Sequence, residues 1–160
     1  MSKIDLWFDN FDNRLDEAAG IIAETATEYY KERFIKKEWD GQAWPAYGTP
    51  DREPQKGSLM MRTNNLFSSV RPSVVEPNRV VISAGSNKVG YARVHNEGLR
   101  VRGVQYVRPH HRKSQKSKPH QVKGHARKID FTMPKRQFMG INKELTDNII
   151  NRLKMAFNQK

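Results

Sequence analysis

Gly90-Tyr91-Ala92-Arg93-Val94-His95-Asn96-Glu97-Gly98 is the first of two short segments around which this sequence is organised. The second is Met133-Pro134-Lys135-Arg136-Gln137-Phe138-Met139-Gly140. In the first segment, Tyr91, Ala92 and Val94 supply apolar groups for a short helix or strand. Gly98 permits the positive φ needed to leave that element. We therefore interpret this segment as one that defines the fold.

The second segment has the same structural character. We expect Pro134 to end a strand, Phe138 to fill the core, and Gly140 to open the turn before a final helix. We also hypothesise that Arg136 pairs with Glu97, which would tie the two segments together. Neither segment carries a catalytic signature, because Glu97 has no evident nucleophile or acid partner. The sequence predicts no catalytic residue.

A basic stretch lies between the two segments. It contains no Asp or Glu from Leu99 to Ile129. The portion from His110 to Arg127 is too polar to bury a core, so we predict a basic loop or arm at about 108–127, flexible when free. Ten Lys and Arg residues are the candidate binding residues: Arg100, Arg102, Arg108, Arg112, Lys113, Lys116, Lys118, Lys123, Arg127 and Lys128.

Two hypotheses for this stretch remain open. Ten cations without a counter-acid can bind phosphates through counterion release, and double-stranded DNA is then the partner. Alternatively, the stretch docks on an acidic face of a neighbouring subunit. The N-terminal region is rich in acids, so self-association is physically reasonable.

Four of the five histidines fall in the basic stretch, at His110, His111, His120 and His125. A zinc site would need clustered ligands, often including Cys or a carboxylate, and the chain has no Cys. The neighbouring cations also disfavour a divalent ion. We therefore expect no metal and no cofactor.

The overall charge is uneven. The 160 residues carry a net charge of +12, but residues 1–38 hold nine acids and six Lys or Arg, and the remainder holds eight acids and 23 Lys or Arg. Only 36% of the residues are hydrophobic, and the mean hydropathy is −0.84. No apolar stretch approaches the roughly 20 residues needed to span a bilayer, so we expect no membrane partner.

Apolar spacings of three and four predict a long N-terminal helix, with a break near 10–13 or a bend at Gly20 as alternatives. A final helix capped by Asn142 is predicted from the i+4 ladder that ends at Phe157. The N-terminal stripe comprises Ile4, Phe8, Phe11, Leu15, Ala18, Ala19, Ile22, Ala26, Tyr29, Tyr30 and Phe34.

Between these helices the sequence predicts mainly strands. Residues 69–75 and 79–84 form a predicted hairpin, and Pro72 indicates an edge or a bulge. Residues 101–107 are predicted to pair with 128–133, and a short helix is predicted over 59–67. We expect one domain over 1–160 of the α+β class, in which a long N-terminal helix and a C-terminal helix pack on a mainly antiparallel β-sheet with a protruding basic loop.

From Phe34 to Phe157 the chain resembles the Mu-like phage virion-morphogenesis family, also called tail-completion proteins. Gly41-Gln42-Ala43-Trp44-Pro45 matches a Gly-x-x-Trp-x-Pro-like segment, and residues 60–69 loosely match the stretch that follows it. Tyr91, His95 and Gly98 match the Tyr-Ala-x-x-His-x-x-Gly block. The Pro-x-Arg-x-Phe-x-Gly block is matched by Pro134, Arg136, Phe138 and Gly140. Two departures are Asn64, where the family prefers Gly, and Gln137, which replaces a frequent Pro.

The resemblance implies a non-enzymatic structural protein of a bacteriophage or prophage tail or head–tail junction. It implies assembly in the host bacterial cytoplasm, followed by incorporation into the virion. It also implies a homo-oligomeric ring, or a connector role beside other neck or tail proteins. An accessory protein that binds nucleic acid through residues 100–128 is the alternative.

Overall fold

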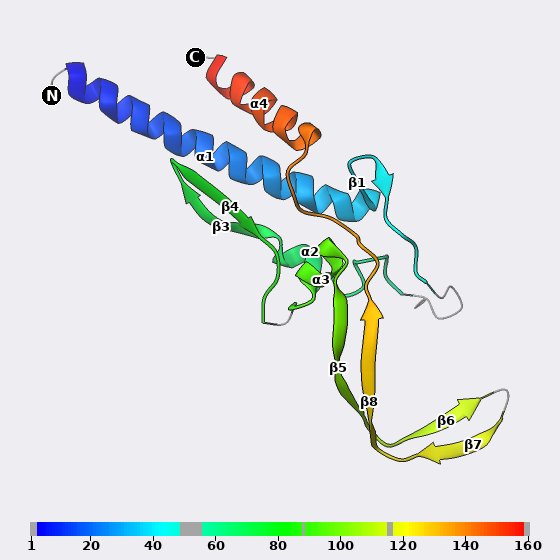
Figure 1. The fold of residues 1–160 in the computed structure, drawn as a ribbon. Coiled ribbons are helices and arrows are strands. Elements are labelled where there is room, and N and C mark those ends of the chain that lie inside the picture. Colours follow the sequence, from blue (N-terminus) through cyan, green and yellow to red (C-terminus); the bar gives the residue numbers. More distant parts are fainter. Residues whose placement is uncertain (1–2, 49–55, 88, 115–116, 159–160) are drawn as a thin grey trace.

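The computed structural model describes residues 3–48, 56–87, 89–114 and 117–158. One long helix, α1 (Lys3–Lys36), starts the chain, and α4 (Lys143–Asn158) ends it. α1 runs without interruption through the region near 10–13 and through Gly20, so the alternative of two helices is wrong. Figure 1 shows α4 lying along α1. The predicted cap of α4 is confirmed, because the backbone N–H of Leu145 donates to Asn142 Oδ1 at 3.0 Å.

The strands form separate antiparallel pairs. β1 (Glu38–Trp39) pairs with β2 (Gln42–Ala43), and the Asp40-Gly41 turn between them has φ values of 51° and 74°. Positive φ at both turn residues is the geometry that suits a two-residue hairpin. β3 (Arg71–Glu76) pairs with β4 (Arg79–Ser83), and the ladder shifts register between Pro72 and Val74, which confirms the predicted irregularity there.

Two further ladders form one projecting ribbon. β5 (Arg100–Val107) pairs with β8 (His125–Thr132), and β6 (His110–Ser114) pairs with β7 (Ser117–Val122) at the far end. The predicted protruding basic arm is present, but over β6 and β7 it is a hairpin of strands and not a loop. β6 and β7 form a second, separate ladder beyond the β5–β8 ladder, and their described side chains are mostly exposed, so sequence patterns of burial do not detect this hairpin.

The α+β class is confirmed, with two differences in arrangement. Over the residues that the structure describes, the strands do not merge into one sheet, and α4 packs on α1 whereas β3 and β4 pack beneath α1. Two short helices, α2 (Asn65–Ser69) and α3 (Ala92–Glu97), lie where the ribbon meets the body. α2 starts later than predicted because Met60 and Asn64 have positive φ values of 64° and 57°, which helical residues do not adopt.

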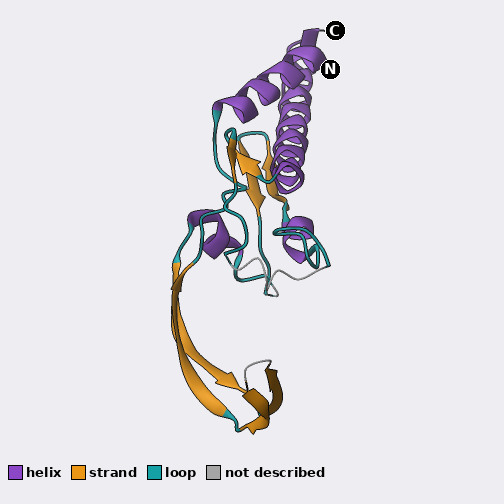
Figure 2. Ribbon diagram, turned by 90° about the vertical axis from the view of Figure 1, so that its right-hand side faces the viewer, coloured by secondary structure: helices purple, strands orange, loops and turns teal. Residues whose placement is uncertain are grey.

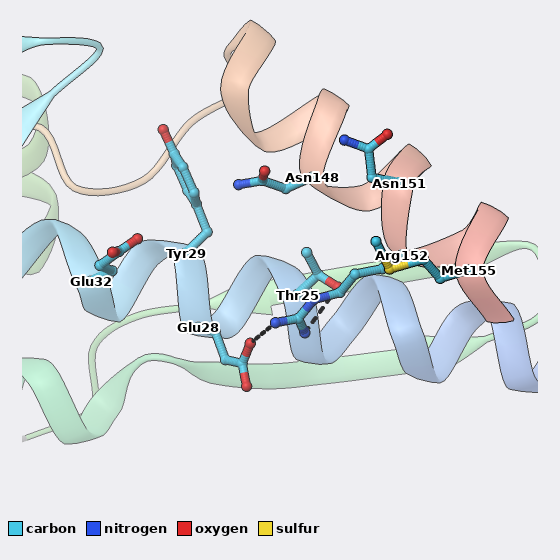
Figure 3. Close-up of a pocket in the computed structure, with 8 residues that line it drawn as sticks. All are labelled: Thr25, Glu28, Tyr29, Glu32, Asn148, Asn151, Arg152 and Met155. Atoms are coloured by element: carbon cyan, nitrogen blue, oxygen red, sulfur yellow. Dashed lines mark hydrogen bonds and ion pairs between the residues drawn. The ribbon is translucent and has the colours of Figure 1, made fainter.

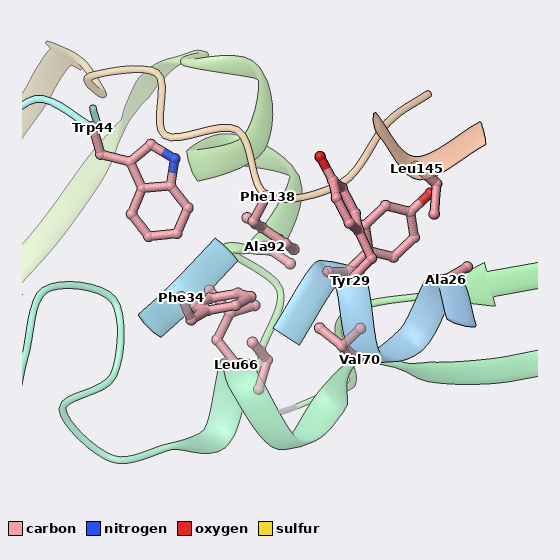
Figure 4. Close-up of a cluster of buried hydrophobic side chains, with 11 residues drawn as sticks. Ala26, Tyr29, Phe34, Trp44, Leu66, Val70, Ala92, Phe138 and Leu145 are labelled. Carbon is pink, nitrogen blue, oxygen red and sulfur yellow. The ribbon is translucent and has the colours of Figure 1, made fainter. Parts of the chain in front are cut away.

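Aromatic side chains dominate the core where α1 ends (Figure 4). Phe34 is fully buried, and its ring centroid lies 4.9 Å from that of Phe138 and 5.6 Å from that of Trp44. The Trp44 indole N–H donates to the Gln137 carbonyl at 2.7 Å. Phe138 therefore fills the core as predicted, and the segment that contains it connects the core to α4.

Candidate functional site: the basic arm and its root

We call the projecting ribbon formed by β5–β8 the arm. Figures 1 and 2 show it extending away from the helices, and β5 and β8 pack on each other far more than on any other helix or strand of the described residues. The arm begins where α3 and the 134–140 segment meet. Contacts around Gly98, Asn96, Arg136 and His95 hold that junction, which is the root of the arm.

Gly98 ends α3 with φ 70°, as predicted. A Cβ at this position would lie 2.8 Å from the Lys135 Cβ and 3.0 Å from the Lys135 Cα, so only glycine allows the two chains to approach this closely. Two backbone hydrogen bonds cross beside it, from Met133 N–H to the Leu99 carbonyl at 3.0 Å and from Arg136 N–H to the His95 carbonyl at 2.8 Å.

Asn96 forms the second set of contacts, which sequence reasoning missed. Its Oδ1 accepts from the backbone N–H of Phe138 and of Met139, both at 2.9 Å, and its Nδ2 donates to the Met139 carbonyl at 3.3 Å. Asn96 occupies a variable position of the Tyr-Ala-x-x-His-x-x-Gly pattern, so the pattern did not single it out. The amide nevertheless joins the two segments directly.

Arg136 supplies the third set. It is 5% exposed and donates from Nε to the Pro45 carbonyl at 2.8 Å and from Nη2 to the Ala46 carbonyl at 2.9 Å. The predicted Arg136–Glu97 pair is wrong, because Glu97 instead accepts from Arg93 Nε at 3.0 Å within α3. Arg93 lies four residues before Glu97 in α3, and side chains at this spacing lie on the same side of a helix, where they can form an ion pair.

His95 is half-buried beside Tyr91, with ring centroids 5.7 Å apart. Burial, and secondly the charge of Arg136, lower the pKa of His95 below its ordinary value. The imidazole is therefore held neutral at the root. The side chains of His95 and Tyr91 line a cavity of about 440 Å³ together with Phe131, Met133 and Pro134.

A hydrogen bond also ties the 134–140 segment to α1. The carbonyl of Gly140 accepts it from Tyr30 Oη at 2.9 Å.

The arm itself has two faces, because side chains alternate along its strands. One face carries Val101, Val107, Ile129 and Phe131, and at its root it meets the cavity. We call the other the basic face. Its members, read from the strand register, are Arg100, Arg102, Val104, Tyr106, Ala126, Lys128, Asp130 and Thr132.

Ion pairs partly neutralise the root of the basic face. Arg100 contacts Asp130 through Nε at 2.6 Å and Nη2 at 2.8 Å, and Arg102 Nε lies 3.5 Å from the same carboxylate. Asp130 lies immediately beyond the acid-free stretch, so the composition of that stretch gave no indication of this pairing. Farther out, Arg127 donates twice to the Gln105 side-chain oxygen, at 3.1 and 2.7 Å.

The remaining candidate cations follow the arm outward. Lys128 is exposed beside Val104, and Arg108, Arg112, Lys118 and Lys123 are exposed at the junction and on the outer hairpin. Lys113 lies on β6, and Lys116 lies outside the described residues. The arm thus brings the candidate cations among the described residues together on one projection.

The arm histidines are engaged locally. His110, His120 and His125 each place Nδ1 within 2.9–3.2 Å of the carbonyl two residues earlier, an arrangement in which the ring nitrogen donates. Within the described part of the chain, no three His, Cys, Asp or Glu side chains are grouped to hold a metal ion. Over the same residues, no helix has the length and apolar character to cross a membrane.

A second hollow lies between α1 and α4 and has a volume of about 660 Å³ (Figure 3). Glu28 and Arg152 form an ion pair at its edge, and Arg152 Nη1 lies 3.5 Å from Thr25 Oγ1. Thr25 already donates to the Ile21 carbonyl at 2.6 Å. These contacts join the two helices, and we assign this hollow to helix packing.

Comparison with known proteins identifies one family. No curated protein and no solved structure matches the chain. The sequence matches the model of one family over residues 1–158, a range that includes both segments of the root and the whole arm. The chain belongs to the phage virion morphogenesis family and has a structural, virion-associated role in phage assembly.

Proposed function

We propose that this protein is a non-enzymatic component of the phage tail or head–tail junction, and that it acts as one domain in a homo-oligomeric ring. The observation that carries the proposal is the arm. A two-stranded ribbon is only marginally stable when its cations and apolar side chains are all exposed to water, so it is suited to contact another molecule. Val104 is 72% exposed and Tyr106 is 65% exposed.

In a ring, the arm of each subunit would have a neighbouring subunit to bind. A surface on one subunit that binds a different surface on the next subunit produces a closed ring when the rotation between them closes. Other neck or tail proteins then bind the ring. Synthesis and assembly take place in the host cytoplasm before the ring enters the virion.

Genetic complementation tests the proposal. Deletion of the gene from the phage or prophage should abolish infectivity while heads and tails still form, and electron microscopy should show them unjoined or incompletely finished. The wild-type gene supplied in trans should restore joined particles, and the protein should be found in them. Normal infectious particles after deletion would contradict the proposed function.

The alternative is a nucleic-acid-binding accessory protein that uses residues 100–128. The exposed cations of the outer arm favour it, because each phosphate contact releases counterions. Binding of the purified protein to duplex DNA should then weaken steeply as salt increases, by a slope of about 0.9 for each phosphate neutralised. Weak binding with a shallow slope, combined with ring formation, would favour assembly instead.

A further inference from the structure

The arm changes its electrostatic character along its length. At the root, the Asp130 carboxylate pairs with Arg100 at 2.6 Å and with Arg102 at 3.5 Å. Five exposed cations lie farther out, and none of them forms an ion pair with another described residue. We call them the outer cations: Arg108, Arg112, Lys118, Lys123 and Lys128.

Two of the outer cations flank the junction between the β5–β8 ladder and the β6–β7 hairpin. Arg108 follows the end of β5, and Lys123 follows the end of β7. The Tyr106 ring packs against this junction, because a Cβ at Gly124 would collide with its hydroxyl and would lie 3.2 Å from Pro109 Cδ. Figures 1 and 2 show the hairpin turning aside from the line of β5 and β8 at this point.

The β6–β7 hairpin carries charge and little apolar surface. Arg112 lies across the ladder from His120, and the ladder shifts register beside it, near the exposed Lys118. Val122 is half-buried, whereas the other described side chains of the hairpin are exposed and mostly polar. The centres of protein–protein interfaces are depleted of charged residues and enriched in aromatic ones, so this hairpin is unlike such a centre. It is suited to a polyanion.

We infer that the outer cations bind the phosphates of duplex DNA, without reading its sequence. The major groove of duplex DNA admits a two-stranded β-ribbon, which is the form of the hairpin. Proteins that bind single strands stack successive bases on aromatic side chains. Between Arg100 and Lys128 the sequence has one Tyr and no Phe or Trp, so a duplex is the better fit.

This inference goes beyond the proposed ring and does not replace it. Val104 and Tyr106, whose exposure supports a contact with another protein, lie on the inner β5–β8 ladder. Most of the outer cations lie at the junction or beyond it. Because the two contacts use different lengths of the arm, one subunit can bind its neighbour and DNA at the same time.

An acidic face of a second copy is the competing partner for the outer cations. Several acids of the helices are already paired within the chain, among them Glu28 with Arg152 and Asp147 with Lys143. A hairpin that docked on these acids would compete with their present partners. The phosphates of DNA hold exchangeable counterions instead, and the release of those counterions favours binding.

Matched charge-removal variants of the full-length chain test the inference. Each variant replaces two Arg and two Lys by Gln at exposed positions. The outer variant combines Arg108→Gln, Arg112→Gln, Lys118→Gln and Lys123→Gln. The control variant combines Arg71→Gln, Arg79→Gln, Lys56→Gln and Lys154→Gln. Circular dichroism verifies folding, fluorescence anisotropy with a labelled duplex of mixed sequence gives the affinity at each salt concentration, and light scattering gives the oligomer mass without DNA.

The expected salt dependence follows from the number of phosphates contacted. Five contacts at about 0.9 each give a slope of about 4.5, so the wild-type affinity should fall about 500-fold between about 50 and 200 mM salt. Removal of four contacts leaves a slope of about 0.9, and the outer variant should lose only about threefold over the same range. The control should keep the wild-type slope, and both variants should keep the wild-type oligomer mass.

Three results would overturn the inference. The outer variant could keep the wild-type slope, or a single strand could bind more tightly than the duplex. Loss of oligomers in the outer variant alone would assign the hairpin to a subunit contact. The proposed function fails separately: a wild type that stays monomeric but binds DNA with the expected slope would contradict the ring and support this inference. A ring that does not bind DNA at low salt would do the reverse.

Discussion

Asn96 gives the sharpest test of the arm root. The substitution Asn96→Ala removes the acceptor for two backbone donors, the N–H groups of Phe138 and Met139, each 2.9 Å from Oδ1. Phe138 is 1% exposed, and so water replaces these bonds poorly. An unsatisfied buried donor costs about 1–3 kcal/mol, and Asn96 is itself half-buried. We therefore expect a loss of about 2–4 kcal/mol in the free energy of unfolding.

Urea denaturation, at a protein concentration and salt at which the chain is monomeric, measures this loss. For a chain of this size, 1 kcal/mol lowers the melting temperature by about 2–4 °C, so the melting temperature should fall by about 4–16 °C. Asn96→Asp keeps an acceptor for both N–H groups and should cost less than alanine. Asn151→Ala, at an exposed position on α4, is the matched control and should be nearly neutral.

A cost below about 0.5 kcal/mol for Asn96→Ala would refute the reasoning, because surface substitutions without a structural role fall in that range. It would mean that the remaining contacts of the root, from Gly98 and Arg136, hold the two segments without the amide. An equal cost for Asn96→Asp and Asn96→Ala would show that the two accepted hydrogen bonds are not what stabilises the root.

Three further predictions concern the same region. Phe34→Ala should destabilise the fold by about 3–5 kcal/mol in thermal or urea unfolding, whereas Ile35→Ala, at a position 68% exposed, should change it little. Arg136→Met should cost about 2 kcal/mol by leaving the two carbonyls it contacts unpaired, and no change would contradict that role. Because the folded-state pKa of His95 lies below its ordinary value of 6.5, the unfolded chain binds the proton more readily. The free energy of unfolding should therefore fall as the pH decreases below about 6.5, and His95→Gln should reduce that fall. The same pH dependence in both proteins would contradict it.

Much of the fold could be predicted because its signals are local. The stripe that ends at Phe34 predicts α1, Asn142 predicts the start of α4, and the β-rich runs on either side of a turn predict the β3–β4 hairpin. Each feature depends on burial, capping or turn geometry within a few residues. The same local rules also indicated the positive φ of Gly98 and the core position of Phe138.

The contacts of the root could not be predicted in the same way. Arg136 donates to carbonyls near Pro45, and a backbone carbonyl carries no sequence signal that could identify it as a partner. Asn96 bonds to backbone N–H groups more than forty residues away. The outer hairpin was missed for a different reason: the described side chains of β6 and β7 are mostly exposed and polar, so their composition is that of a loop.

Asp130 divides the arm into two regions with different electrostatic roles. It is the single acid between Glu97 and Glu144 in the sequence, and it contacts both Arg100 and Arg102. Those two arginines therefore hold the ribbon register at the root, where a two-stranded ladder alone is marginal. Because Asp130 offsets one of these two positive charges, more of the charge available to a partner lies beyond them. Substitutions at Arg100 should act on the arm's own stability, whereas substitutions at Lys128 and Arg108 should act on what the arm binds.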